Sequence, residues 1–158
     1  MPDIRAASSA VIPAPAPIVY GLIADYHQGH PSILPPKYFR NLTVEEGGRG
    51  AGTRISFEMR SFGKIQRFRG EVAEPEPGRR LVETYPDSGI ETVFTVDPAD
   101  EGRSSLVTIA SSYHKPGLPG WFDRLLAPVF LRTVYAAELR LLGEQAAATM
   151  PHGAPDRS

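Results

Sequence analysis

The sequence contains no cysteine. Disulfide bonds, thiolate catalysis and zinc or iron–sulfur sites with cysteine ligands are therefore excluded, and a cytoplasmic location is favoured. Long apolar runs are also missing: no stretch approaches the roughly 18 residues that span a bilayer, so we expect no stable insertion into membranes. The first residues carry a charged pair and no apolar segment, and we expect them not to form a signal peptide.

An excess of either charge is missing as well. The 17 lysines and arginines are balanced by 18 aspartates and glutamates, which gives a formal net charge of -1. This balance argues against a general attraction to nucleic acid or anionic lipid, so we expect no nucleic-acid partner. The glycines at positions 47–52 lack the lysine and the serine or threonine of a phosphate-binding loop. The sequence thus indicates no nucleotide or other cofactor.

Two histidines three residues apart, His27 and His30, are candidates for metal ligands. A metal site would need a third ligand on a defined helix or strand, whereas residues 27–36 are rich in proline and predict a loop with at most a single helical turn. We therefore predict no metal, and we favour histidines at the surface or at the rim of a pocket.

Apolar and polar residues alternate over most of the middle of the chain, which is the pattern of strands with one buried face. In residues 53–59, for example, Ile55, Phe57 and Met59 alternate with polar or charged side chains. Similar segments, separated by turns rich in proline and glycine, predict strands at residues 4–12, 39–45, 53–59, 67–72, 81–85, 90–96 and 106–113.

Two segments have helical periodicity instead. After the prolines at positions 13, 15 and 17, the apolar residues predict a short helix that ends near Asp25. A longer helix is predicted at residues 121–148, with a kink or restart near Ala127 because Pro128 cannot donate a backbone hydrogen bond. The apolar stripe of this helix is predicted to contain Ala127, Phe130, Val134, Ala137 and Leu141, with Leu131 at its edge and Glu138 nearby.

The register of one hairpin can be predicted from its side chains. If residues 62–63 form a two-residue turn, Phe57 lies opposite Phe68 and Glu58 lies opposite Arg67. This pairing joins aromatic rings on one face and opposite charges on the other, and a shift by one residue would destroy both. Carried into the later strands, the same inner face contains Leu81, Glu83, Tyr85, Ile90, Thr92, Phe94, Val96, Val107, Ile109, Ser111 and Tyr113.

Nothing in the sequence divides the chain, because it contains neither an internal repeat nor a linker. We expect one domain over residues 1–150. Residues 151–158 mix proline, glycine and polar residues without periodicity, which predicts a disordered tail. A monomer and a homodimer are both compatible with the sequence.

Several short motifs resemble one known superfamily. Ile-Pro-Ala at residues 12–14, followed by Val19 and Tyr20, resembles its opening pattern, in which an aromatic residue, usually tryptophan, follows the valine. Gly-Ala-Gly-Thr at residues 50–53 resembles its G-x-G-T start of the third strand, and residues 72–81 resemble the strand and turn that follow. The superfamily is the START-like or SRPBCC superfamily, and the resemblance is closest to its polyketide cyclase/dehydrase-like branch.

The resemblance implies an α+β helix-grip fold: a curved antiparallel sheet of six to seven strands wrapped round a long C-terminal helix, with a short helix after the first strand. It also implies that the sheet bends away from this helix and leaves an apolar cavity for a small lipophilic molecule, such as a lipid, a polyketide-like aromatic or a quinone. The residues expected to bind the ligand are Ile55, Phe57, Met59, Phe68, Tyr85, Phe94, Ile109, Tyr113, Phe130, Val134 and Leu141.

Two functions are compatible with such a cavity. We favour binding of a lipophilic molecule without chemistry, and the alternative is a cyclase or dehydratase in which Glu83, Tyr113 or His30 transfers protons. A convergent cluster of inward polar groups would favour the enzyme, and a single polar anchor would favour the carrier. Glu83 would face solvent instead if its strand were shifted by one residue, and Glu138 could extend to the rim of the helix.

Overall fold

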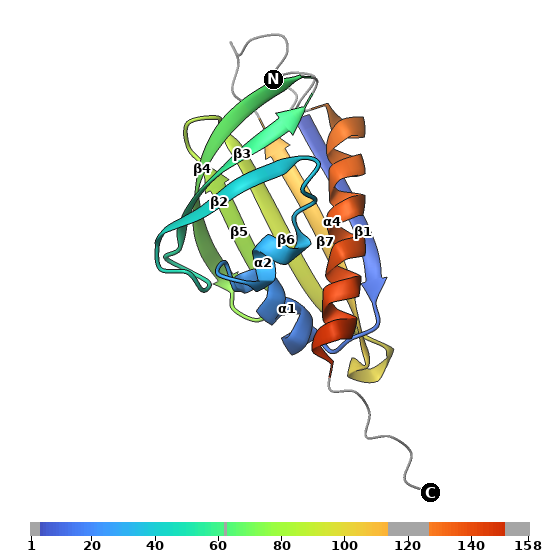
Figure 1. The fold of residues 1–158 in the computed structure, drawn as a ribbon. Coiled ribbons are helices and arrows are strands. Elements are labelled where there is room, and N and C mark those ends of the chain that lie inside the picture. Colours follow the sequence, from blue (N-terminus) through green and yellow to red (C-terminus); the bar gives the residue numbers. More distant parts are fainter. Residues whose placement is uncertain (1–3, 62, 114–126, 151–158) are drawn as a thin grey trace, which may run out of the picture.

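Within its described residues, the chain folds into a single antiparallel sheet of seven strands in the order β1-β7-β6-β5-β4-β3-β2 (Figure 1). The structure, a computed structural model, describes residues 4–61, 63–113 and 127–150. The strands are β1 (Ile4–Ile12), β2 (Phe39–Glu46), β3 (Arg54–Ser61), β4 (Lys64–Glu76), β5 (Arg80–Tyr85), β6 (Ile90–Ala99) and β7 (Ser104–Tyr113). All seven predicted strands are therefore confirmed in position, and with the helices they form the α+β helix-grip fold.

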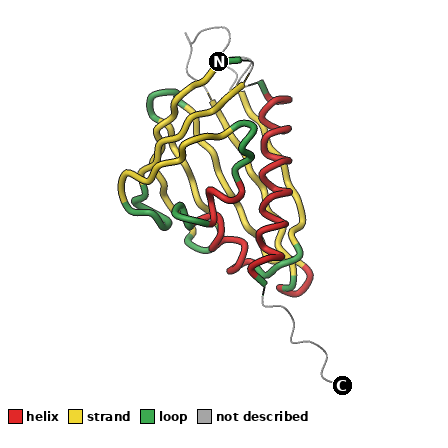
Figure 2. The backbone as a smooth tube through the Cα atoms, in the orientation of Figure 1, coloured by secondary structure: helices red, strands yellow, loops and turns green. Residues whose placement is uncertain are grey.

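The helices lie on one side of the curved sheet (Figures 1 and 2). They are α1 (Ala16–Ala24), the single-turn α2 (Gly29–Ile33) and the long α4 (Pro128–Thr149), and a short 3-10 turn, η1 (Asp100–Gly102), precedes β7. Helix α4 packs lengthwise along β1 and contacts both α1 and α2, and α1 lies near the C-terminal end of α4. The predicted part of the long helix before Ala127 and the predicted tail at residues 151–158 lie outside the described residues.

Prolines at the start of α1 and α4 explain where these helices begin. Each helix has a proline in its first turn, where the missing N–H would have no partner inside the helix. Pro128 therefore begins α4, beside the kink or restart predicted near Ala127. None of the helices in the described residues combines the length and the apolar character needed to cross a bilayer.

The predicted hairpin register is confirmed. Phe57 of β3 pairs with Phe68 of β4, Glu58 pairs with Arg67, and the two phenyl rings stack with their centroids 5.5 Å apart. Of the turn residues, Phe62 lies outside the described residues, while Gly63 has a φ of 74°, which glycine adopts without strain. The aromatic pair fixes which side of β3 and β4 faces inward, and therefore fixes the inner face of the neighbouring strands.

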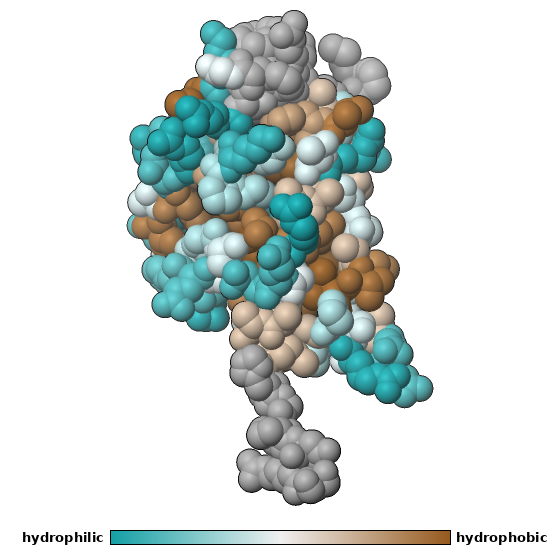
Figure 3. All heavy atoms as spheres, turned by 45° about the vertical axis from the view of Figure 1, so that its right-hand side comes forward, coloured by the Kyte–Doolittle hydropathy of each residue, from teal (hydrophilic) through white to brown (hydrophobic). Residues whose placement is uncertain are grey.

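The inner face is buried as predicted, from Leu81 in β5 to Tyr113 in β7. Its apolar side chains form one cluster with α1, α2 and α4. Hydrophilic residues cover much of the outer surface, and hydrophobic residues appear between them in patches (Figure 3). Exposed or half-buried residues alternate with the buried ones along β4, β6 and β7, so the sheet has an outer face open to solvent and a concave face directed at the helices.

The predicted stripe of α4 was wrong by about one residue, or about 100° of rotation. The buried side of the helix contains Leu131, Val134, Tyr135, Glu138, Leu139, Leu142 and Ala146. Phe130, Ala137 and Leu141 are only half-buried at its edge. The prediction ranked apolar residues above polar ones, whereas two polar residues, Tyr135 and Glu138, lie on the buried side. Their burial places polar groups in the space between α4 and the sheet.

Candidate functional site

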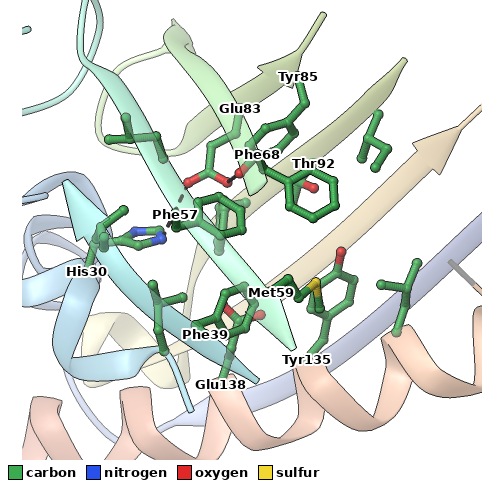
Figure 4. Close-up of a pocket in the computed structure, with 16 residues that line it drawn as sticks. His30, Phe39, Phe57, Met59, Phe68, Glu83, Tyr85, Thr92, Tyr135 and Glu138 are labelled. Carbon is green, nitrogen blue, oxygen red and sulfur yellow. Dashed lines mark hydrogen bonds and ion pairs between the residues drawn. The ribbon is translucent and has the colours of Figure 1, made fainter. Parts of the chain in front are cut away.

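A cavity lies between the concave face of the sheet, α2 and α4 (Figure 4). The empty volume of the cavity, including its open mouth, is about 620 Å³. Apolar side chains form most of the wall, and a few polar groups project from it. The lining residues are His30, Leu34, Phe39, Leu42, Ile55, Phe57, Met59, Phe68, Glu83, Tyr85, Ile90, Thr92, Phe94, Leu131, Tyr135 and Glu138.

The structure brings together only part of the predicted ligand-binding set. The predicted residues that line the cavity are Ile55, Phe57, Met59, Phe68, Tyr85 and Phe94. The predicted residues outside the lining are Ile109, Tyr113, Phe130, Val134 and Leu141. Ile109 and Val134 are instead fully buried members of the hydrophobic core, with no exposed surface. Phe130 and Leu141 lie at the helix edge, as a consequence of the rotated stripe.

Tyr113 was also a candidate for proton transfer. It is buried at the end of β7, paired with Ile90 of β6, and it lies outside the cavity lining. Glu83 and His30, the other two candidates, both line the cavity. The sequence did not identify Leu34, Phe39, Leu42 or Leu131 as wall residues, because α2, the start of β2 and the true helix stripe were not placed against the sheet.

Glu83 is the centre of a buried group of polar side chains. It points inward from β5 and is only 4% exposed, so the inward orientation is confirmed. One carboxylate oxygen accepts a hydrogen bond from the hydroxyl of Tyr26 at 2.6 Å, and the other accepts one from Tyr85 at 2.5 Å. Nε2 of His30 lies 3.4 Å from the first oxygen. A buried carboxylate requires such partners, and here three side chains supply them.

The two tyrosines are held as hydrogen-bond donors. Burial, and then the negative charge of Glu83, raise the pKa of both Tyr26 and Tyr85 well above the usual value of 10.0. Both hydroxyls therefore keep their protons at physiological pH, and each donates a hydrogen bond to the carboxylate of Glu83. The ring of Tyr85 contacts the rings of Phe57 and Phe68 edge-on, which fixes it against the wall.

His30 is buried, with 2% of its surface exposed, so the favoured prediction of a surface or rim histidine is wrong for this residue. The single turn of α2 places it over the sheet, where its ring stacks on Tyr26 with centroids 4.4 Å apart. Its Nδ1 lies 2.7 Å from the carbonyl oxygen of Ile23. Because a carbonyl oxygen can only accept, Nδ1 carries a proton, and Nε2 is left facing Glu83. His27, in contrast, is exposed.

Glu138 is a second buried carboxyl group, 3% exposed, on the opposite wall of the cavity. Burial, and then the charge of Glu83, raise its pKa well above the usual value of 4.5. The predicted alternative, in which Glu138 extends to the rim, is wrong because the side chain points from α4 into the cavity (Figure 4). The two carboxyl groups thus face one cavity from different elements.

Three hydroxyl groups form a further polar cluster beside Glu83. Thr92 and Ser111 are hydrogen-bonded at 2.6 Å, and Ser111 is hydrogen-bonded to the hydroxyl of Tyr135 on α4. Glu83, Thr92 and Ser111 are direct cross-strand neighbours on β5, β6 and β7. The sequence placed all three on the inner face, and this row of polar residues was the signal that could have located the cluster.

The described residues contain no group of three histidine, cysteine, aspartate or glutamate side chains that could hold a metal ion. The chemistry that the lining residues themselves offer is hydrogen bonding and proton transfer. A buried carboxylate with two tyrosine donors and an imidazole, opposite a carboxyl group that retains its proton, can take a proton from one atom of a bound molecule and supply one to another.

A curved antiparallel sheet that grips a C-terminal helix over such a cavity defines a helix-grip protein of the SRPBCC superfamily. The chain belongs to the family described as polyketide cyclase/dehydrase and lipid transport, whose sequence model matches residues 3–147. A search among curated proteins found no match to the sequence.

Solved structures support the same assignment. The KanY protein, known from an NMR solution structure, is 26% identical, with a TM-score of 0.79 over 93% of this chain and 99% of its own. A protein from Thermus thermophilus is 24% identical, with a TM-score of 0.73 over 95% of this chain and 100% of its own. The Zhui aromatase/cyclase from a Streptomyces species is 17% identical, with a TM-score of 0.71 over 96% of this chain and 98% of its own. The last two show the shared fold alone.

Proposed function

We propose that the protein binds a small lipophilic molecule bearing a carbonyl group in the cavity and transfers protons on it, as a cyclase or dehydratase does. Glu83 is the proposed base, and His30 its partner. The observation that carries this proposal is the convergence of His30, Glu83, Tyr85 and Glu138 on one cavity with otherwise largely apolar walls. A site that only held a lipophile would not need two buried carboxyl groups, since burying them costs stability.

The geometry around Glu83 suits a base. Tyr26 and Tyr85 fix the carboxylate by one hydrogen bond to each oxygen, so that its position is set before a ligand binds. His30 is held by Ile23 and can take up a proton at Nε2, which then compensates the negative charge of Glu83. The aromatic wall of Phe57 and Phe68 would orient a flat apolar ligand against this group.

A carrier is the second candidate, favoured by the apolar character of most of the wall and by the lipid transport in the family description. In a carrier, Glu83 would serve only as a polar anchor for one end of the ligand. In an enzyme, removal of the Glu83 charge should slow a reaction of the ligand. In a carrier, it should change only the affinity for the ligand.

The proposal can be tested with acetophenone, a small aromatic ketone. A base beside the bound ketone should speed the exchange of its methyl protons for deuterium in heavy water, which proton NMR follows directly. Glu83→Gln keeps the shape and hydrogen-bonding capacity of the side chain, so this variant should still bind an environment-sensitive apolar dye while exchange slows by about a hundredfold or more. Glu91→Gln, on an exposed position of the neighbouring strand, is the matched control and should behave like the wild type.

Exchange at the same rate in the wild type and Glu83→Gln, with dye binding retained in both, would contradict the enzyme and support the carrier. Loss of dye binding in the folded Glu83→Gln variant would also assign Glu83 to anchoring. Failure of the wild type to bind either dye or acetophenone would overturn both candidates, because each requires an accessible cavity.

A further inference from the structure

Among the described residues, Glu138 has no partner that explains its burial. None of them donates a hydrogen bond to its carboxyl group or pairs with it as a cation, although only 3% of the residue is exposed to solvent. Glu83, in contrast, has three partners. Buried polar groups are almost always hydrogen-bonded, so a carboxyl group aimed into a cavity without a partner indicates that the partner is a molecule that enters the cavity.

The groups around Glu138 determine whether its carboxyl group is neutral or ionised. The titratable groups that face it are Glu83 on β5, His30 on α2, Tyr26 after α1 and Tyr135 one turn earlier on α4. No lysine or arginine lines the cavity within the described residues. With an acidic neighbour and no fixed cation, the neutral carboxyl group is favoured, and a neutral carboxyl group has one hydrogen to donate.

We propose that Glu138 is the hydrogen-bond and proton donor to a carbonyl oxygen of the bound molecule, opposite Glu83 across the cavity. This inference rests on the proposed function and adds to it the residue that binds the carbonyl oxygen of the ligand and supplies it with a proton. It also gives Glu138 a catalytic role, because the side chain touches the atom on which charge develops.

The step balances with these two residues alone. Glu83 takes a proton from the carbon beside the carbonyl group, and the electron pair of that C–H bond forms a carbon–carbon double bond. The carbonyl π pair moves to the oxygen, which takes the proton of Glu138. The product is the enol, with Glu83 neutral and Glu138 ionised, and the reverse transfers restore both groups. Donors placed where negative charge develops are among the strongest contributions to catalysis.

A binding experiment tests the donor separately from the base. Affinity is measured by displacement of the apolar dye with two probes of nearly equal shape: acetophenone, which has the carbonyl oxygen, and α-methylstyrene, which has a methylene group in its place. The wild type should bind acetophenone roughly 2- to 10-fold more tightly, the value of one hydrogen bond. This preference should disappear as the pH rises through the raised pKa of Glu138, because the carboxylate cannot donate.

Two substitutions give opposite patterns. Glu138→Leu removes the donor and should abolish the preference at every pH. Glu138→Gln retains an amide donor and should keep the preference even at high pH, where the wild type loses it. Binding of both probes with the same preference in the wild type and in Glu138→Leu would overturn the role of Glu138 while leaving the cavity and Glu83 in place. Failure of both probes to bind the wild type would overturn the proposed function itself.

Discussion

Glu83 and Glu138 are both buried glutamates, yet only Glu83 has hydrogen-bond partners among the described residues that stabilise a negative charge. Glu83 accepts hydrogen bonds from Tyr26 and Tyr85 and faces His30, so its negative charge is compensated locally. Glu138 meets only burial and the charge of Glu83, so the pKa of its carboxyl group is raised. Two carboxyl groups that face one cavity in such different surroundings suit a site that uses one group as acid and the other as base.

The raised pKa of Glu138 predicts how its substitution changes stability with pH. The unfolded chain releases the Glu138 proton near the usual pKa of 4.5, whereas the folded chain retains it to higher pH. The contribution of this group to folding is therefore fully present below that value and is lost as the pH rises toward the folded pKa, by up to about 1.4 kcal/mol for each pH unit. The side chain of the Glu138→Gln variant cannot ionise. The free energy of unfolding of this variant should therefore rise relative to that of the wild type as the pH increases from about 4.5 toward the folded pKa of Glu138.

Urea denaturation of the two proteins at about pH 4.5 and about pH 7.5 measures the effect. The difference in the free energy of unfolding should favour Glu138→Gln more strongly at the higher pH. Glu144→Gln, at an exposed position of the same helix, is the control and should show no comparable gain. A constant difference between the wild type and Glu138→Gln at both pH values would mean that Glu138 ionises normally in the folded chain.

At the scale of elements, prediction from sequence succeeded where two independent constraints agreed. The β3–β4 register was predictable because the Phe57–Phe68 pair and the Glu58–Arg67 pair both required it. It failed for the buried stripe of α4, where polar residues occupy the buried side. The single turn predicted in residues 27–36 is present as α2, but its position over the sheet was not predicted. Sequence patterns reveal burial through apolar residues, so they misplace elements whose buried face carries polar groups for a ligand.

The space beside α4 gives a prediction about packing. Leu131 lines the cavity, whereas Leu142, about three turns later, is fully buried and outside the cavity lining. Replacing Leu142 with the larger phenylalanine should cost about 1–3 kcal/mol, because a filled core must be distorted to admit it. Leu131→Phe should cost less, since its ring can extend into the cavity. Equal losses in denaturant unfolding would mean that the space at Leu131 is not available.

At the scale of the whole molecule, the order of strands and helices was sufficient to predict the fold. The alternation of apolar and polar residues in each strand agreed with the face that the strand buries, and agreement between local pattern and overall fold is what specifies a structure. The site was only partly predictable. Glu83 and the aromatic wall followed from the inner-face register, but the position of His30 depends on how a loop folds back over the sheet, a contact between distant parts of the chain. Family membership does not supply the reaction, because function depends on the site rather than the fold.

The proposed roles of Glu83 and Glu138 both require that a ligand enters the cavity between the sheet and α4. The most direct test is titration of an environment-sensitive apolar dye into the wild type, Leu131→Phe and Leu142→Phe, with each variant shown to be folded. We expect saturable binding to the wild type, weaker binding to Leu131→Phe, whose larger side chain takes up part of the cavity, and unchanged binding to Leu142→Phe. Equal binding by all three proteins would contradict this expectation, because the dye would then occupy a site other than the one that Glu83 and Glu138 face.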